Sequence, residues 1–152
     1  PSPNLKMIAS RGVGKSPDKN LAWNNKVYCA QGDDLLEGKA RAHIKIKDSY
    51  FMIEPHRGMQ RGTLGFNGIQ RKHIEASVGV PVKCETFHPD LIDAYSMKIE
   101  LSRIDMKRND MTVNAEKLTK HLGKVFNGQV FGMGQKFAMD FLGLPLICKV
   151  AE

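Results

Sequence analysis

Cysteine is scarce in this sequence of 152 residues, which contains only Cys29, Cys84 and Cys148. Their odd number and wide separation do not fit a disulfide-linked framework. Structural zinc sites need paired ligands a few residues apart, and no such pair of Cys or His residues occurs. We therefore expect three buried, reduced thiols and no metal site.

Long apolar runs are also missing. No segment approaches the roughly 18 apolar residues that a membrane-spanning helix requires, and no charged-then-apolar signal occurs at the amino terminus. With 41% hydrophobic and 26% charged residues, the composition is that of a folded globular protein rather than a disordered chain. The sequence therefore predicts a cytoplasmic protein with no direct membrane insertion.

Recognisable catalytic machinery is absent as well. There is no G-x-S-x-G or H-E-x-x-H motif, and the five histidines are scattered singly. Residues 9–16 fit a relaxed phosphate-loop pattern, but Pro17 follows at once and no amphipathic helix comes after it. We therefore expect neither catalytic residues nor a cofactor in this chain. A stand-alone enzyme is kept as an alternative.

Positive charge is plentiful and uneven. Residues 1–84 carry 14 Lys or Arg and 7 Asp or Glu, whereas residues 85–152 carry 9 of each. The net charge of +7 therefore lies in the first part, and its field attracts acidic partners to one side. A basic nucleic-acid-binding domain is a second alternative. Such domains usually combine basic residues with exposed aromatic ones, and Trp23 is the sole tryptophan here.

Short strands dominate the expected structure of the first part. Residues 5–9 predict a strand followed by a basic loop, and residues 26–30 and 78–87 predict further strands. Apolar and polar residues alternate over Ala42–Ile46, as in a strand with one buried face. Because turn residues follow, this strand is expected to form a hairpin with residues 51–53.

The second part has a different organisation. The charge balance changes near residues 86–90, where Pro89 also restricts the chain to an extended conformation. Alternation over residues 97–101 and 137–141 predicts strands, and residues 144–150 complete a hairpin. A helix is expected between these strands, from apolar residues at helical spacing behind an N-cap: Asn114, Leu118, Leu122, Val125 and Phe126.

Two basic spots stand out. A glycine turn within residues 66–74 is expected to present Gln70, Arg71 and Lys72 at the surface. Lys107 and Arg108 form a second basic pair after the strand at residues 97–105. Each spot alone could be an ordinary solvated surface, but two spots on adjacent lobes can flank a cleft.

Three segments carry a family resemblance: residues 65–72, residues 126–135 and residues 144–150. Together they resemble the amino-terminal domain of the N-ethylmaleimide-sensitive fusion protein family, in a fungal form, over nearly the whole chain. The resemblance implies an α+β, mainly β fold. A double-psi β-barrel would span residues 1–84, a linker residues 85–89 and a small α/β lobe residues 90–152, as in the related valosin-containing protein.

The resemblance also implies a function. In this family the domain binds the SNAP adaptor, which carries SNARE complexes, and passes on motion from two AAA+ modules that bind ATP and magnesium in a homohexamer. Those modules are absent here, so this chain would bind no cofactor itself. The implied location is the cytoplasm, with peripheral recruitment to membranes in vesicle transport. By motif matching, basic residues would form the adaptor site in a groove between the lobes: Lys15, Arg71, Lys72, Lys107 and Arg108.

Overall fold

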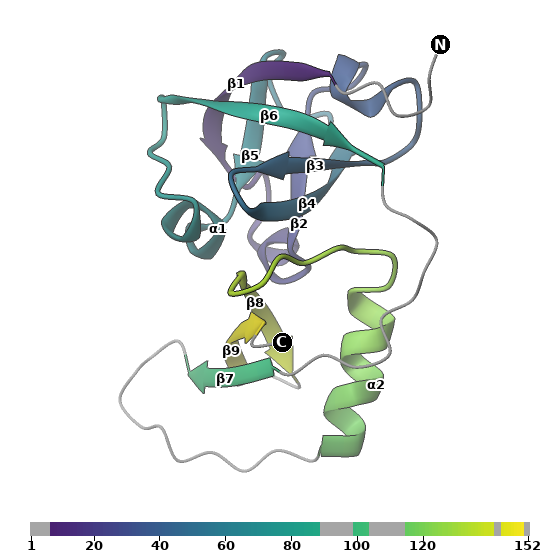
Figure 1. Cartoon of the computed structure of the whole chain (residues 1–152), viewed down its shortest axis with the longest axis vertical. Coiled ribbons are helices and arrows are strands. Elements are labelled where there is room, and N and C mark those ends of the chain that lie inside the picture. The colour runs from purple at the N-terminus through teal and green to yellow at the C-terminus, as the bar shows by residue number, and fades with distance from the viewer. Residues whose placement is uncertain (1–6, 89–98, 104–114, 142–143, 151–152) are drawn as a thin grey trace.

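The computed structural model describes residues 7–88, 99–103, 115–141 and 144–150. Six strands close into a barrel, and a three-stranded sheet with one α-helix follows it along the chain. In Figure 1 the barrel occupies the upper part of the molecule and the sheet and its helix the lower part. This mainly β fold, with a barrel and a small α/β region, confirms the expected fold class.

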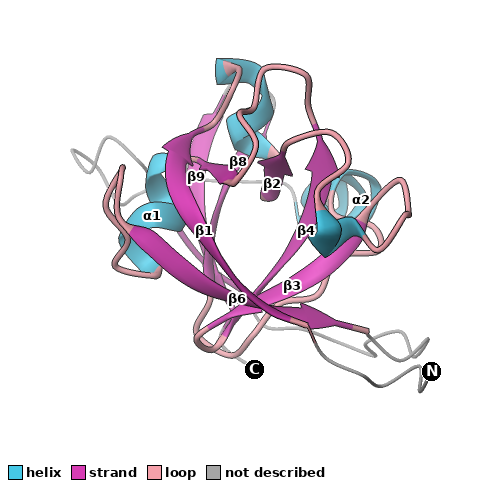
Figure 2. Ribbon diagram, turned by 90° about the horizontal axis from the view of Figure 1, so that it is seen from above, coloured by secondary structure: helices cyan, strands magenta, loops and turns pink. Residues whose placement is uncertain are grey.

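The barrel strands are β1 (Ile8–Lys15), β2 (Lys26–Cys29), β3 (Ala42–Ile46), β4 (Ser49–Pro55), β5 (Thr63–Phe66) and β6 (Pro81–Phe87). Their order around the ring is β1-β5-β2-β4-β3-β6, and β6 pairs with β1 to close it. Figure 2 looks into this ring, with β1 beside β6. β1 pairs with β5 in parallel, and β2 does the same with β4. In chain order, the β2–β4 pair is nested within the β1–β5 pair, and the double-psi connectivity that the resemblance implies stays a prediction.

The barrel core follows the alternation of its strands. In β3 the apolar residues are buried, while His43 and Lys45 between them are partly exposed. The expected hairpin of β3 with β4 is confirmed, since Ile46 pairs with Ser49 across a two-residue turn. Fully buried side chains fill the centre of the ring, each contributing roughly 1.5–3 kcal/mol relative to exposure: Val27, Leu35, Ile44, Ile53, Leu64 and Phe66.

Strand β1 is longer than the sequence indicated. We expected a basic loop after residue 9, and this was wrong, because the strand continues to Lys15. Gly14 of β1 lies opposite Gly65 of β5, and a Cβ added at Gly65 would lie 2.9 Å from the carbonyl oxygen of Lys15. Glycine here permits a close approach of two strands rather than a turn.

Helix α1 (Gly68–His73) replaces the glycine turn that we expected between β5 and β6. Asn67 caps it, because the Asn67 side chain accepts from the Gln70 N–H at 2.8 Å and the Gln70 side chain accepts from the Asn67 N–H at 2.9 Å. Gln70 is fully buried, so the prediction that it is presented at the surface was also wrong. Two short 3-10 helices, η1 (Lys19–Trp23) and η2 (Asp34–Leu36), complete the connections of the barrel.

The second unit contains β7 (Ile99–Arg103), α2 (Ala115–Val125), β8 (Lys136–Phe141) and β9 (Leu144–Val150). Its strands are antiparallel in the order β7-β9-β8, which confirms the expected hairpin of β8 with β9. Leu118 of α2 packs with Phe137 and Met139 of β8 in a core separate from that of the barrel. The expected N-cap Asn114 lies outside the described residues.

The barrel ends later than the expected boundary. β6 continues through residues 85–87, which pair with β3, as the extended pattern of residues 78–87 indicated; the resemblance had implied a linker there. The rest of that linker and the start of the second lobe lie outside the described residues. No helix in the described part of the chain is long and apolar enough to span a membrane.

All three cysteines are buried and free, as expected. Burial raises the pKa of Cys29, Cys84 and Cys148 to about 12 each, so their thiols stay protonated and unreactive near neutral pH.

Polar contacts join the barrel to residues 126–135. The side-chain oxygen of Gln135 accepts from the N–H of Tyr50 at 2.9 Å, and its Nε2 donates to the Tyr50 carbonyl at 2.8 Å. Nε2 of His43 donates to the Gly128 carbonyl at 2.9 Å. Gly132 lies so close to the β3–β4 turn that an added Cβ would be 2.2 Å from the carbonyl oxygen of Asp48. We call this contact region the junction.

Candidate basic docking surface

Lys15 and Arg71 are 56 positions apart in the sequence, but both lie next to Phe66 at the end of β5. Lys15 ends β1 opposite Phe66, the last residue of β5. The Phe66 carbonyl accepts from the backbone N–H of Ser16 at 3.0 Å and also from Nη1 of Arg71. The Arg71 guanidinium therefore lies beside the chain that carries Lys15, and the structure brings these two expected site residues together.

Buried polar contacts hold the helix that carries Arg71 and Lys72. Nε2 of Gln70 donates to the side-chain oxygen of Asn25 at 3.1 Å, and Nδ2 of Asn67 donates to the Ala22 carbonyl at 2.7 Å. With Gln70 fixed inward, the following Arg71 is half-buried and Lys72 is exposed. Helix α1 therefore presents its two consecutive cations in a defined orientation.

Positive charge continues from α1 onto the second unit. Helix α1 contacts β8, whose first residue, Lys136, is exposed. Burial lowers the pKa of His73 on α1, and the nearby charge of Lys136 lowers it further. The sequence did not single out Lys136, because its partners on α1 are more than 60 residues away. We call Lys15, Arg71, Lys72 and Lys136 the α1 basic surface.

The other expected pair, Lys107 and Arg108, lies outside the described residues. Among the residues that the structure does describe, none of the four members of the α1 basic surface forms an ion pair. Within that part of the chain, no ion pair neutralises their charges. In the sheet register, Lys136 of β8 lies opposite Lys149 of β9, and Lys149 lies opposite Glu100 of β7.

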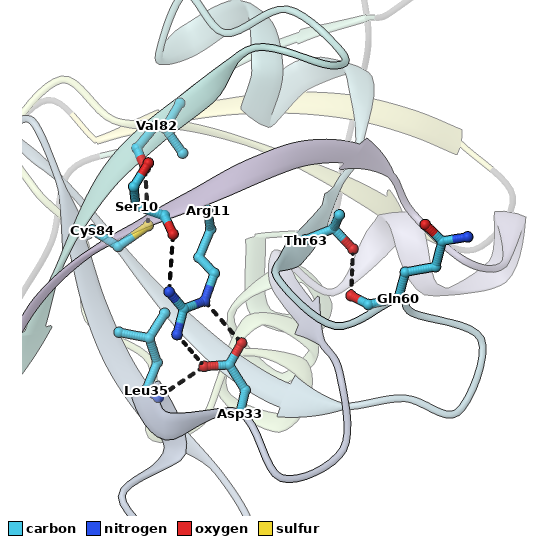
Figure 3. A network of polar contacts seen from close by, with 8 residues as sticks. All are labelled: Ser10, Arg11, Asp33, Leu35, Gln60, Thr63, Val82 and Cys84. Atoms are coloured by element: carbon cyan, nitrogen blue, oxygen red, sulfur yellow. Dashed lines mark hydrogen bonds and ion pairs between the residues drawn. The ribbon is translucent and has the colours of Figure 1, made fainter.

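A second charged cluster has a structural role in the barrel. The guanidinium of Arg11 on β1 donates to both carboxylate oxygens of Asp33, at 2.9 and 3.1 Å, as Figure 3 shows. Asp33 also accepts from the Leu35 N–H at 2.8 Å and caps η2. A cavity of about 340 Å³ opens beside this pair, lined also by Asp34 and Arg61. Since two cations and two anions line it, this cavity has no charge preference.

The segment that fits the phosphate-loop pattern is strand β1, paired on both sides with β5 and β6. Its N–H groups belong to the barrel ladder and do not form the concave cradle that wraps a phosphate. Within the described ranges, no three His, Cys, Asp or Glu side chains gather as metal ligands would.

Comparison with models of known protein families and with curated protein sequences gave no match to this chain. The fold and the chemistry of the surface therefore carry the functional argument, together with the resemblance of the three segments.

Proposed function

We propose that this chain is a non-catalytic, adaptor-binding domain that captures an acidic protein through the α1 basic surface. The proposed partner is the SNAP adaptor, and through it SNARE complexes, as the resemblance implies. The observation that carries the proposal is the Phe66 carbonyl, which accepts from the Arg71 guanidinium of α1 and from the N–H of Ser16, next to Lys15, while α1 also contacts β8 of the second unit. Cations from both units are thus held on adjoining elements.

Binding on such a surface depends on the number of contacts. Each exposed ion pair is worth at most about 1 kcal/mol and weakens with salt. In the proposed setting, this domain precedes two AAA+ modules of a homohexamer that disassembles SNARE complexes during vesicle transport. Several copies engaging several adaptors would then raise the overall affinity without any single strong contact, and ATP-driven motion of the modules would pass through the bound adaptors.

Charge reversal tests the proposal. Lys15→Glu and Lys136→Glu, one change in each unit, should each weaken binding of purified SNAP adaptor about tenfold, because an attractive pair becomes repulsive. Isothermal titration calorimetry on the whole chain measures this, at low and at high salt. Both lysines are exposed, so the melting temperature should stay nearly constant.

Lys39→Glu is the matched control. It makes the same change in net charge at an exposed lysine that precedes β3, at the opposite end of that strand from α1. The control should bind the adaptor like the wild type. Equal binding by all three variants would contradict the proposed surface, and displacement of the adaptor by non-specific DNA at equal charge would favour the nucleic-acid alternative.

A further inference from the structure

A second feature of the barrel is a groove between the end of β3 and the start of β6. Its volume is about 470 Å³, within the usual size of a ligand site. Buried Ile46 and Ile74 line its floor, and partly buried Val82 lies beside them. Val80 on the rim is 55% exposed, although it is apolar. No member of the α1 basic surface lines this groove.

Part of strand β6 lacks a neighbour along the groove. The β3–β6 ladder stops at the pair of Lys45 with Glu85, whereas the β1–β6 ladder continues to Pro81. The Thr86 N–H points to the β1 side, where it donates to Met7, so by alternation the N–H and C=O of Lys83 point to the other side. Within the described residues, no strand pairs with β6 at Lys83 on this side, and neither group has another backbone partner.

Lysine 47 explains why the ladder stops and adds charge to the groove. Lys47 has a φ of 55° and forms, with Asp48, the turn from β3 into β4, so β3 extends no further along β6. Its ammonium group instead donates to the Ile74 carbonyl at 2.7 Å, just after α1. Lys45 and Glu85 oppose each other in the ladder, so the other charged residues described as lining the groove are two cations, Lys47 and Lys83, and one anion, Glu75.

From this geometry we propose that the groove binds an extended, acidic peptide segment of a partner protein that carries one or more apolar side chains. The peptide adds a short strand beside Lys83, whose free N–H and C=O pair with its backbone. Its apolar side chain covers Val80 and Val82, and its carboxylates lie near Lys47 and Lys83. The positive field of residues 1–84 selects acidic over basic segments.

The test uses the whole chain and a fluorescein-labelled peptide, Asp-Glu-Val-Ile-Val-Asp-Glu, with binding followed by fluorescence anisotropy. Val80→Asp should weaken binding about tenfold, because it places a carboxylate against an apolar and acidic ligand. Val78→Asp is the matched control: Val78 is 53% exposed on the same loop but does not line the groove. It should change the affinity less than about twofold.

Amide hydrogen exchange provides a second measurement that does not depend on variants. The peptide should slow exchange at Lys83, and a peptide with lysines in place of its acidic residues should not. Absence of saturable binding, equal effects of the two valine variants, or unchanged exchange at Lys83 would each overturn the proposal. So would a dimer of the chain that Val80→Asp dissociates, since a second copy would then fill the groove.

Discussion

Asp33 combines three roles in a side chain that is only 2% exposed. It pairs with Arg11, caps η2 and joins strand β1 to the loop after β2. Burial alone would raise the pKa of its carboxyl, but the hydrogen bond from Arg11, the Leu35 N–H and the charge of Arg11 outweigh burial and lower it. The ionised form is therefore the one that stabilises the fold.

We expect Asp33→Asn to lower the free energy of unfolding by about 2–3 kcal/mol near neutral pH, because a charged, buried hydrogen-bond acceptor is lost. Ionisation of Asp33 stabilises the fold fully above its ordinary pKa of about 4, and this contribution disappears as the pH falls through the lower pKa of the folded state. In urea unfolding, the free energy of unfolding of the wild type should therefore exceed that of Asp33→Asn near neutral pH, and the difference should become smaller in acid. An advantage that is unchanged in strong acid would contradict this role.

At the scale of elements, the stability of α1 depends on polar contacts of its buried side chains rather than on the length of the helix. Gln70→Leu keeps the volume of the side chain but leaves the Asn67 N–H and the Asn25 side-chain oxygen without their partner. We expect a loss of about 2–4 kcal/mol from these two buried groups, measured as a lower melting temperature. The proposed adaptor binding should weaken too, because Arg71 and Lys72 would lose their fixed orientation.

Lys72→Gln is the control on the same helix. Lys72 is exposed and takes no part in the cap, so its replacement should change the stability by less than about 0.5 kcal/mol. Equal melting temperatures for Gln70→Leu and the wild type would show that the cap does not hold α1.

The sequence predicted those elements whose pattern is local. Alternation identified β3 and β8, and helical spacing identified α2. The local pattern did not predict the full extent of β1, because Gly65, the parallel strand partner beside which Gly14 fits into a strand, lies 51 positions away. Helix α1 has only 6 residues, too few for a periodic signal. The Asn67 and Gln70 spacing of a capping box was the one clue that would have revealed it.

The candidate site was predictable only in part, for the same reason. Resemblance and charge selected Lys15, Arg71 and Lys72, which the structure places on adjoining elements. Lys136 came only from the folded arrangement, because nothing in its neighbourhood in the sequence links it to α1.

At the scale of the whole molecule, the junction couples the two units. Gly132→Ala places a methyl group against the Asp48 carbonyl, so one side must move, at a cost of about 1–3 kcal/mol. Hydrogen exchange should speed up roughly tenfold at the Tyr50 amide, which bonds Gln135, while the barrel core stays protected.

Gly123→Ala is the matched control for the junction. Gly123 lies in α2 with nothing within 4 Å of an added Cβ, so alanine should stabilise the helix by up to about 1 kcal/mol. Exchange at Tyr50 should be unchanged in this variant. The same acceleration in both variants would mean that the junction does not depend on the close approach at Gly132.

Closure of the ring by β1 and β6 also determines when the barrel can form during synthesis. Ile8 of β1 pairs with Glu85 of β6, so one edge of β1 stays unpaired until β6, the last strand of the barrel, has been synthesised. Contacts between such distant positions form slowly, since a long loop must close first. A nascent chain that has been synthesised only as far as β5 exposes unpaired strand edges on β1 and β3. Until β6 has been synthesised, only chaperones or rapid synthesis of the remaining chain prevent these edges from pairing with other chains.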